Sequence, residues 1–160
     1  MKPTRAFLHG LESTSRGTKG LFFRDRYPDM ILEDFWGPFP ERMQRLTTLL
    51  DGKQELILVG SSYGGLMAAV YACLHEERVR KLILLAPALH LEPYHPYLDR
   101  KLHMPILIFH GVRDDVVPLE RVRDIAGRLF VRHTLSVVED DHSLHQIFAA
   151  LPWDALLEAC

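Results

Sequence analysis

Cysteine is scarce in this sequence, with only two among 160 residues. Cys73 lies inside an apolar run and Cys160 is the last residue, so neither suggests a disulfide framework. No apolar run is long enough to cross a bilayer, which argues against a membrane-spanning helix. Internal repeats and low-complexity stretches are also missing, so the composition is that of a globular domain.

Clusters of basic residues are missing as well. The 19 Lys and Arg residues are scattered among 21 Asp and Glu residues, and the net charge is -2. Because no basic cluster with interleaved aromatic residues occurs, we expect no nucleic-acid partner. Lys2, Arg5 and His9 interrupt the start of the chain, which lacks the apolar core of a secretory signal. We expect a cytoplasmic protein that acts on a small molecule, and its oligomeric state is left open.

The length predicts one domain, residues 1–160, because 160 residues are too few for a core sheet and a separate lid domain. Six runs rich in apolar residues predict strands, and helix-like segments separate nearly all of them. This alternation predicts an α/β fold, a parallel sheet with helices on both faces. The expected strands are residues 5–9, 30–35, 55–60, 81–85, 106–110 and 134–138.

Three segments predict helices of different kinds. Residues 66–74 are apolar all round, which is typical of a buried helix. Pro118 opens an amphipathic surface helix. A third helix is expected over residues 144–151, where apolar residues form a stripe that ends at Pro152. The stripe of the second helix consists of Leu119, Val122, Ile125 and Leu129.

The most informative motif is G-x-S-x-G at residues 60–64, between a strand-like and a helix-like run. A serine hydroxyl is a poor nucleophile at neutral pH, so it must face a base on one side and N–H donors on the other. A sharp turn from strand to helix presents it in this way. Ser62 is the predicted nucleophile, because the neighbouring Ser61 has no glycine two positions before or after it.

An acid and a histidine follow Ser62 in the chain order Ser, Asp, His. Asp114 comes after the expected strand at residues 106–110, and His142 comes after the one at residues 134–138. Parallel strands place their C-terminal ends along one sheet edge, so these loops can converge. His142 would take the Ser62 proton and return it to the leaving group, while Asp114 would orient the imidazole. Taken singly, the acid also fits a solvated turn and the histidine a surface position.

His9-Gly10 follows the first expected strand. A glycine there lets the chain turn so that the next backbone N–H points at the nucleophile. The predicted oxyanion donors are therefore the N–H groups of Leu11 and Tyr63, the second at a helix start, where the dipole favours negative charge. The alternative for His9-Gly10 is a simple turn at the end of a strand.

These segments resemble the α/β-hydrolase family, and more narrowly its small esterases and acyl-thioesterases with little or no lid. The resemblance implies the strand order 2-1-3-4-5-6 without the usual first antiparallel hairpin. It also implies that Asp114 is the triad acid and that the first oxyanion donor follows Gly10. One departure is Asp141, which stands directly before the histidine where many relatives have glycine. The matching segments are residues 9–10, 17–19, 60–65, 85–88, 110–118 and 141–142.

Residues 88–104 occupy the place where relatives insert a lid, and they are too few to build one of several helices. Leu89, Tyr94 and Tyr97 are candidate contacts for an acyl group, the alternative being that they cover the sheet edge. The three histidines of this segment match no standard metal-ligand spacing, so no metal site is expected. They are His90, His95 and His103.

The resemblance implies a reaction as well as a fold. A serine nucleophile argues against the epoxide hydrolases and dehalogenases of the family, which use an aspartate there. We predict a hydrolase of carboxylic esters or thioesters that forms an acyl-serine intermediate and needs no cofactor. Residues 17–19 favour thioesters slightly, although the triad cannot separate the two. Peptidase and perhydrolase activities are alternatives, and so is a non-catalytic binding protein with the same fold.

Overall fold

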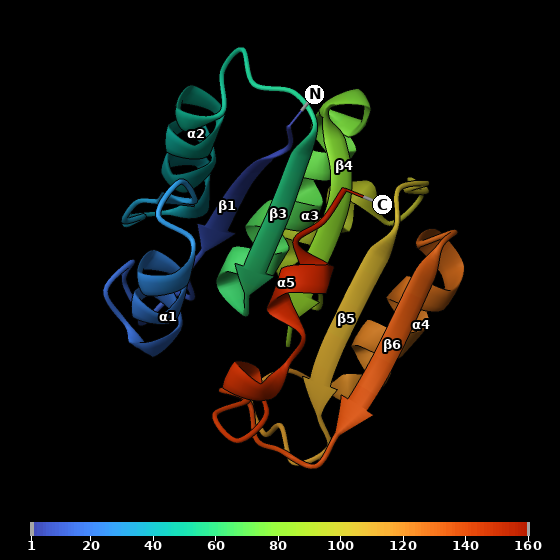
Figure 1. Cartoon of the computed structure of the whole chain (residues 1–160). Helices are drawn as coiled ribbons and strands as arrows, with labels where there is room; N and C mark the ends of the chain where they lie inside the picture. Colours follow the sequence, from blue (N-terminus) through green and yellow to red (C-terminus); the bar gives the residue numbers. More distant parts are fainter. Residues whose placement is uncertain (1, 160) are drawn as a thin grey trace.

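A six-stranded parallel sheet forms the centre of the computed structural model, which describes residues 2–159 (Figure 1). The strand order is β2-β1-β3-β4-β5-β6, and every neighbouring pair is parallel. The predicted α/β fold and strand order are therefore confirmed, and the described residues form no large lid domain. The strands are β1 (Thr4–Leu8), β2 (Ile31–Leu32), β3 (Leu56–Ser61), β4 (Val79–Leu85), β5 (Ile106–Gly111) and β6 (His133–Val138).

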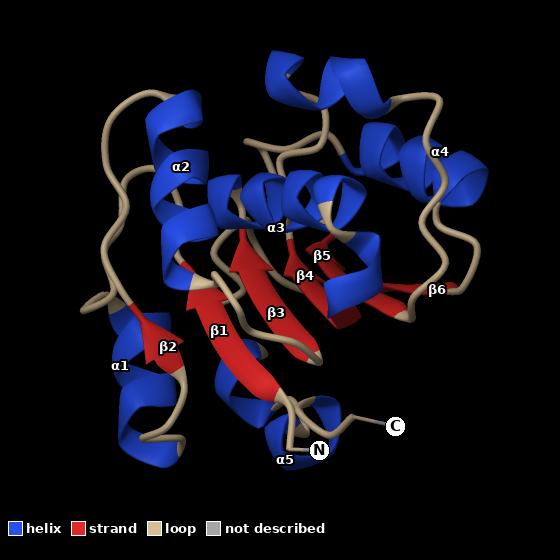
Figure 2. Ribbon diagram, turned by 90° about the horizontal axis from the view of Figure 1, so that it is seen from above, coloured by secondary structure: helices blue, strands red, loops and turns tan. Residues whose placement is uncertain are grey.

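Helices cover both faces of the sheet (Figure 2). On one face lie α2 (Phe39–Leu49), α3 (Tyr63–Leu74) and α4 (Leu119–Leu129). The other face carries α1 (Thr18–Arg26) and the short α5 (Trp153–Leu156). Three 3-10 helices are found at η1 (Glu76–Arg78), η2 (Glu92–Tyr97) and η3 (Phe148–Ala150). Within residues 2–159, no helix has the length and apolar character needed to cross a bilayer.

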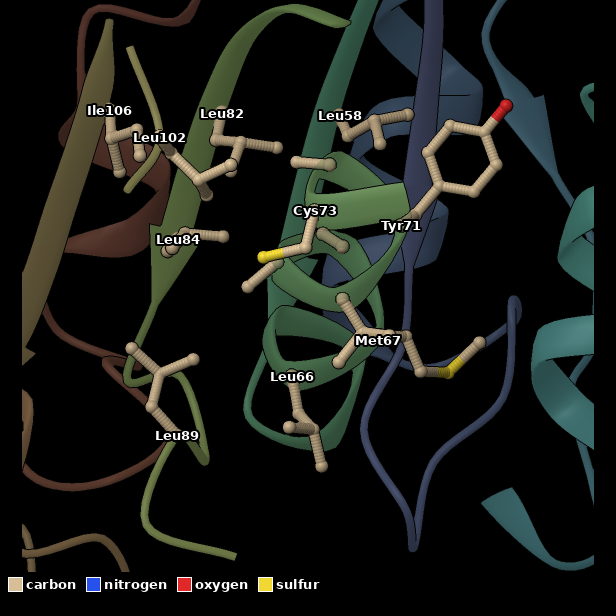
Figure 3. Packing of buried hydrophobic residues seen from close by; sticks show 14 of the residues in the cluster. Leu58, Leu66, Met67, Tyr71, Cys73, Leu82, Leu84, Leu89, Leu102 and Ile106 are labelled. Carbon is tan, nitrogen blue, oxygen red and sulfur yellow. The ribbon is translucent and has the colours of Figure 1, made fainter. Parts of the chain in front are cut away.

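Alternating side chains along the strands build two hydrophobic cores, since successive strand residues point to opposite faces. Leu58, Leu82 and Leu84 point toward α3 and pack on its buried residues (Figure 3). Ile57 and Ile83, their strand neighbours, enter the second core with α1 and α5. The predicted buried helix is confirmed in α3, where every residue from Gly64 to Cys73 is buried.

The strand expected at residues 30–35 is much shorter in the structure, because β2 contains only Ile31 and Leu32. Side chains satisfy the backbone beyond it instead of a neighbouring strand. The N–H of Phe35 donates to Nε2 of His9 at 2.8 Å, and the carbonyl of Asp34 accepts a hydrogen bond from Nε of Arg45 at 2.7 Å. The chain therefore leaves the sheet edge early.

The helix expected over residues 144–151 is wrong. Leu144 has a φ of 54°, which a right-handed helix does not allow. The N–H groups of Gln146 and Ile147 donate to the carboxylate of Asp140, which competes with helical hydrogen bonds. The apolar residues are nevertheless buried, since Leu144 and Phe148 belong to the second core.

Candidate active site

Ser62 occupies the sharp turn between β3 and α3, with φ 55° and ψ -112°. A positive φ is uncommon for a residue with a side chain and costs energy, so the surrounding backbone must hold it. Its N–H donates to the carbonyl of Leu85 at 2.8 Å, and its carbonyl accepts the N–H of Ala88 at 3.0 Å. The end of β4 and the segment that follows it thus hold the backbone N–H and the backbone carbonyl of Ser62.

Two glycines permit the close approach of strand and helix around Ser62. A Cβ on Gly60 would lie 2.4 Å from the carbonyl oxygen of Gly64, and a Cβ on Gly64 would lie 2.0 Å from that of Leu8. Both obstacles are backbone atoms, which cannot move aside as a flexible side chain can. Side chains at these positions are therefore incompatible with this turn.

The structure brings together the three side chains expected to form a triad. Nδ1 of His142 lies 2.8 Å from Oδ2 of Asp114, and Nε2 lies 3.0 Å from Oγ of Ser62. A carboxylate only accepts hydrogen bonds, so the Nδ1 that faces it carries the proton. Nε2 is then an acceptor and receives the O–H of Ser62. This tautomer is the one that a base acting on the serine requires.

Several groups hold the carboxylate of Asp114. Its Oδ1 accepts the N–H groups of Val116 and Val117, each at 2.8 Å, and its side chain is only 1% exposed. The fully buried His110 places Nε2 3.0 Å from the carbonyl of Val117 and 3.3 Å from Oδ2 of Asp114. Burial lowers the pKa of His110, which favours the neutral ring that donates from Nε2. The next residue, Asp115, is exposed.

Asp140 organises the loop that carries His142. Its fully buried carboxylate accepts the N–H of Asp141 at 2.8 Å, of Gln146 at 3.0 Å and of Ile147 at 2.9 Å. Three donors on one carboxylate fix the ends of a turn that has the histidine inside it. Asp140 and Asp141 also lie near His145, with ligand-type atoms within 4.8 Å of one another. Both oxygens of Asp140 are engaged by backbone amides in this arrangement.

Lys19 connects α1 to the same loop. Its Nζ donates to the carbonyl of Ser143 at 2.5 Å, and it lies 5.4 Å from the ring centroid of Phe148. Burial lowers the pKa of the ammonium, while the negative charges of Asp141 and Asp140 raise it in part. The lysine therefore spans the space between α1 and the residue that follows the histidine.

The loop after β1 lies beside the nucleophile, because a Cβ on Gly10 would lie 3.6 Å from Cβ of Ser62. The carbonyl of Gly10 accepts the N–H of Ser13 at 3.2 Å and lies 2.7 Å from Nδ1 of His9. Since Nε2 of His9 accepts the N–H of Phe35, Nδ1 carries the proton and donates. The carbonyl of Gly10 and the N–H of Leu11 belong to the same trans peptide and point in opposite directions. The N–H of Leu11 therefore points away from Ser13, whose N–H the carbonyl accepts.

Tyr63, the other expected oxyanion donor, is the first residue of α3. The first N–H groups of a helix have no acceptor inside the helix, so this amide is available for an anion. Its ring lies in contact with Phe39, at 5.9 Å between centroids, and under the guanidinium of Arg42. The backbone of Tyr63 is thereby held at the end of the turn that contains Ser62.

Two of the three predicted acyl contacts are buried in the core. Leu89 and Tyr94 have no exposed surface and belong to the core around α3, as Figure 3 shows for Leu89. A side chain with no exposed surface does not contact a substrate in this structure, so the structure contradicts the prediction for these two residues. Tyr97 is half-buried, and its ring lies 6.0 Å from that of Tyr94.

A cleft of about 590 Å³ lies instead between α1 and the segment after β6. It reaches His142 and the residue before the nucleophile, and we call it the active-site cleft. Its walls combine aromatic side chains with a few polar groups. The lining residues are Phe7, His9, Gly10, Ser13, Thr18, Lys19, Leu21, Phe22, Asp25, Ser61, His142, Ser143, His145, Phe148 and Ala149.

Sequence reasoning missed three residues that hold this site: Lys19, His110 and Asp140. Two of them had a visible signal, because His110 ends a strand just before the predicted acid and Asp140 stands two positions before the predicted base. Lys19 lies in the matching segment 17–19, but nothing in the sequence pointed to its partner, since Ser143 lies 124 positions away.

Comparison with known proteins agrees with the fold of this chain. A family model described as the alpha/beta hydrolase fold matches residues 37–100. The sheet order, the turn at Ser62 and this match agree, so the chain has the α/β-hydrolase fold, and the resemblance seen in the sequence is confirmed at the level of the fold. No curated protein matches the sequence.

The solved structures that are similar to this chain include proteins from three different organisms. Alpha/beta hydrolase domain-containing protein 10 from mouse has 19% identity and a TM-score of 0.77, over 96% of this chain and 89% of its own. Est1E from Butyrivibrio proteoclasticus has 16% identity and a TM-score of 0.78, with 98% and 86% covered. Monoacylglycerol lipase from Paleococcus ferrophilus has 15% identity and a TM-score of 0.75, with 98% and 94% covered. At these identities the likeness shows the fold alone.

Proposed function

We propose that the protein is a serine hydrolase that cleaves carboxylic esters or thioesters through an acyl-serine intermediate. The observation that carries the proposal is the hydrogen-bonded chain from Ser62 to His142 to Asp114, with distances of 3.0 and 2.8 Å. Each of the three comes from a different loop, and each is held by further hydrogen bonds. A chain of this kind performs acyl transfer on several unrelated folds.

In the first half of the proposed reaction, Oγ of Ser62 attacks the carbonyl carbon while Nε2 of His142 takes its proton. The buried carboxylate of Asp114 stabilises the imidazolium that results. The imidazolium then protonates the leaving oxygen or sulfur, and the alcohol or thiol departs. In the second half, water gives a proton to the imidazole and attacks the acyl-serine, which releases the carboxylic acid and the serine hydroxyl.

The tetrahedral intermediates carry a negative oxygen, for which we propose the N–H groups of Leu11 and Tyr63 as donors. His9 supports this role, because it fixes the carbonyl of Gly10 and with it the direction of the next N–H. The amide of Tyr63 adds the favourable dipole of α3. Removal of one oxyanion donor typically costs about 3 kcal/mol of transition-state stabilisation.

The names of similar structures support a hydrolase, since they include a putative hydrolase from Agrobacterium vitis and a monoacylglycerol lipase. Est1E is also described with ferulic acid bound. Esters and thioesters pass through the same tetrahedral oxyanion, so the site serves either substrate. A peptidase is less favoured, because the described residues provide no segment that resembles a peptide-binding module.

A fluorophosphonate probe tests the proposal, because it reacts covalently with an activated serine. We expect the wild type to be labelled and Ser62→Ala to be unlabelled, with ester hydrolysis reduced at least about a thousandfold. Ser136→Ala removes a hydroxyl from β6 and is the matched control, which should label and react as the wild type does. Labelling of Ser62→Ala would contradict the assignment, and an unlabelled wild type would favour a non-catalytic binding protein.

Hydrolysis of p-nitrophenyl esters and of acyl-CoA thioesters with equal acyl length compares the two proposed substrate classes. The ratio of kcat/KM between the two series decides the leaving-group class. Ser62→Ala should abolish both activities, since one nucleophile serves both.

A further inference from the structure

The active-site cleft runs from the catalytic side chains along α1. Ser61 and His142 lie at its inner end, next to the nucleophile. From there α1 lines it from Thr18 to Asp25, and Phe148 and Ala149 of the segment after β6 line it as well. A substrate whose carbonyl lies at Ser62 can therefore extend its adjoining chain along this helix.

The walls of the cleft are mainly apolar. The rings of Phe22 and Phe148 lie 5.0 Å apart in an edge-to-face contact, so together they form one continuous apolar surface of the cleft. Phe7 lies at the base, and Leu21 is 51% exposed at the rim. Apolar surface left open to water gains free energy when a ligand covers it, at roughly 25 cal/mol per Å². The cleft is thus suited to an apolar group.

The charges around the cleft do not favour an anion. Lys19 already donates to the carbonyl of Ser143, faces the ring of Phe148 and lies in the field of Asp140 and Asp141. Asp25 adds a carboxylate at the outer end. His145, a second potential cation, is paired with Asp141 at 2.9 Å. A carboxylate bound in the cleft would therefore lie near several negative charges, while the two nearby cationic side chains already have partners.

The length of the cleft limits the size of the group. Seven helical residues separate Thr18 from Asp25, a rise of about 10 Å at about 1.5 Å per residue. An extended chain advances about 1.2 Å per bond, so about eight bonds span this distance. Longer chains would pass Asp25 and reach solvent.

We propose that the active-site cleft binds the acyl group of the substrate, and that this group is uncharged and either aryl or linear with up to about eight carbons. The inference rests on the proposed function. The acyl group stays on the enzyme through both halves of the reaction, so a walled cleft suits it. The leaving group must depart and be replaced by water, so we place it on the solvent-exposed side of His142, whose side chain is 22% exposed.

Ala149→Phe tests the inference, because Ala149 is exposed and lines the cleft, so the larger side chain would fill it without entering a core. We expect the ratio of kcat/KM for p-nitrophenyl octanoate to that for p-nitrophenyl acetate to fall by about tenfold, the equivalent of about two methylene groups left unburied. Ala150→Phe is the matched control, because Ala150 is exposed in the same 3-10 helix and outside the cleft lining. It should leave both esters unchanged.

Two further comparisons sharpen the test. Wild-type enzyme should prefer p-nitrophenyl hexanoate to mono-p-nitrophenyl adipate, which has the same number of carbons and a terminal carboxylate. A preference for the adipate would overturn the uncharged assignment. If Ala149→Phe lowers activity on octyl acetate and spares the octanoate ester, the cleft holds the leaving group and the inference is wrong.

The acetate ester separates this inference from the proposed function. If the wild type hydrolyses p-nitrophenyl acetate through Ser62 and Ala149→Phe leaves the chain-length profile unchanged, only the inference fails. If no ester is hydrolysed, or hydrolysis survives Ser62→Ala, the proposed function fails, and the inference fails with it.

Discussion

The proposed nucleophile, Ser62, and the proposed base, His142, are held in different ways. Ser62 lies in a turn fixed by backbone hydrogen bonds and by two glycines within two residues of it. His142 lies in a loop fixed by side chains, with Asp140 binding the loop from inside and Lys19 reaching it from α1. The first arrangement is local and tolerates no added atom, whereas the second depends on contacts between distant parts of the chain. Changes near the serine should therefore affect the fold, and changes near the histidine should affect the rate.

Gly64→Ala should have the largest effect, since the new Cβ would meet the carbonyl of Leu8 at 2.0 Å. We expect a loss of about 3 kcal/mol or more in the free energy of unfolding, at the upper end for overpacking, because only backbone can move. Gly127→Ala in α4 is the matched control, since its Cβ meets nothing within 4 Å. Alanine is the better helix former, so this control should gain about 0.5 to 1 kcal/mol. Urea unfolding measures both, and equal stability of the two variants would contradict the contrast.

Asp140→Ala should mainly slow the reaction. Three backbone N–H groups lose their acceptor, and the imidazole of His142 moves from the serine. A displacement of about 1 Å can cost about a hundredfold in rate, so we expect kcat to fall by about that factor. The pseudo-first-order rate of fluorophosphonate labelling should fall in parallel. Glu139→Gln is the control, because this exposed neighbour pairs only with Arg113 on the surface and should leave both rates unchanged.

Lys19→Met should have a smaller effect in the same direction. It removes one hydrogen bond to the carbonyl of Ser143 and keeps most of the apolar stem that covers Phe148. A hydrogen bond from a charged donor contributes about 1.5 kcal/mol or more, so kcat/KM should fall by about tenfold for every ester tested. Lys101→Met changes an exposed lysine far from the cleft and serves as the comparison. A larger loss for long acyl chains than for acetate would show that the lysine binds substrate instead of holding the loop.

The pH dependence of stability should show the smallest change. Burial lowers the pKa of His9 beside the nucleophile and of His110 beside the acid. The unfolded chain binds protons near pH 6.5 and the folded chain resists them, so stability should fall as the pH drops below about 6.5 toward the folded pKa values. Thermal unfolding from pH 8 to 5 measures this, and His110→Asn should flatten part of the slope. A Tm that stays constant over this range would contradict the buried neutral rings.

The contrast also explains how much the sequence could predict. The turn at Ser62 and the strands around it follow from patterns within a few residues, whereas the strand order follows from the resemblance to the α/β-hydrolase family. The structure confirms this fold and strand order. The short β2 and the failed helix at residues 144–151 have another cause. His9 accepts the N–H of Phe35 beyond β2, and Asp140 accepts the N–H of Ile147 within the expected helix. The periodicity of apolar residues carries no information about such side-chain hydrogen bonds.

The acyl contacts were misplaced for a related reason. Leu89 and Tyr94 lie in the segment where relatives insert a lid, and apolar character alone cannot separate a core residue from a substrate contact. The cleft is formed by α1 and the segment after β6, which are remote in sequence, so only the folded chain shows that they face each other. Asp114 and His142 were placed correctly in space because strand ends in a parallel sheet share an edge.

The hydrogen bond between Lys19 and Ser143 also has a consequence for folding order, because it joins residues 124 positions apart. Contacts of such long sequence separation pay the loop-closure entropy before they contribute, so they form late. During synthesis the turn at Ser62 can form on β3 and α3 while His142 and the far wall of the cleft have not yet emerged. The proposed activity would therefore appear at the last stage of folding, so the ester hydrolysis that we propose would report on fully folded chains.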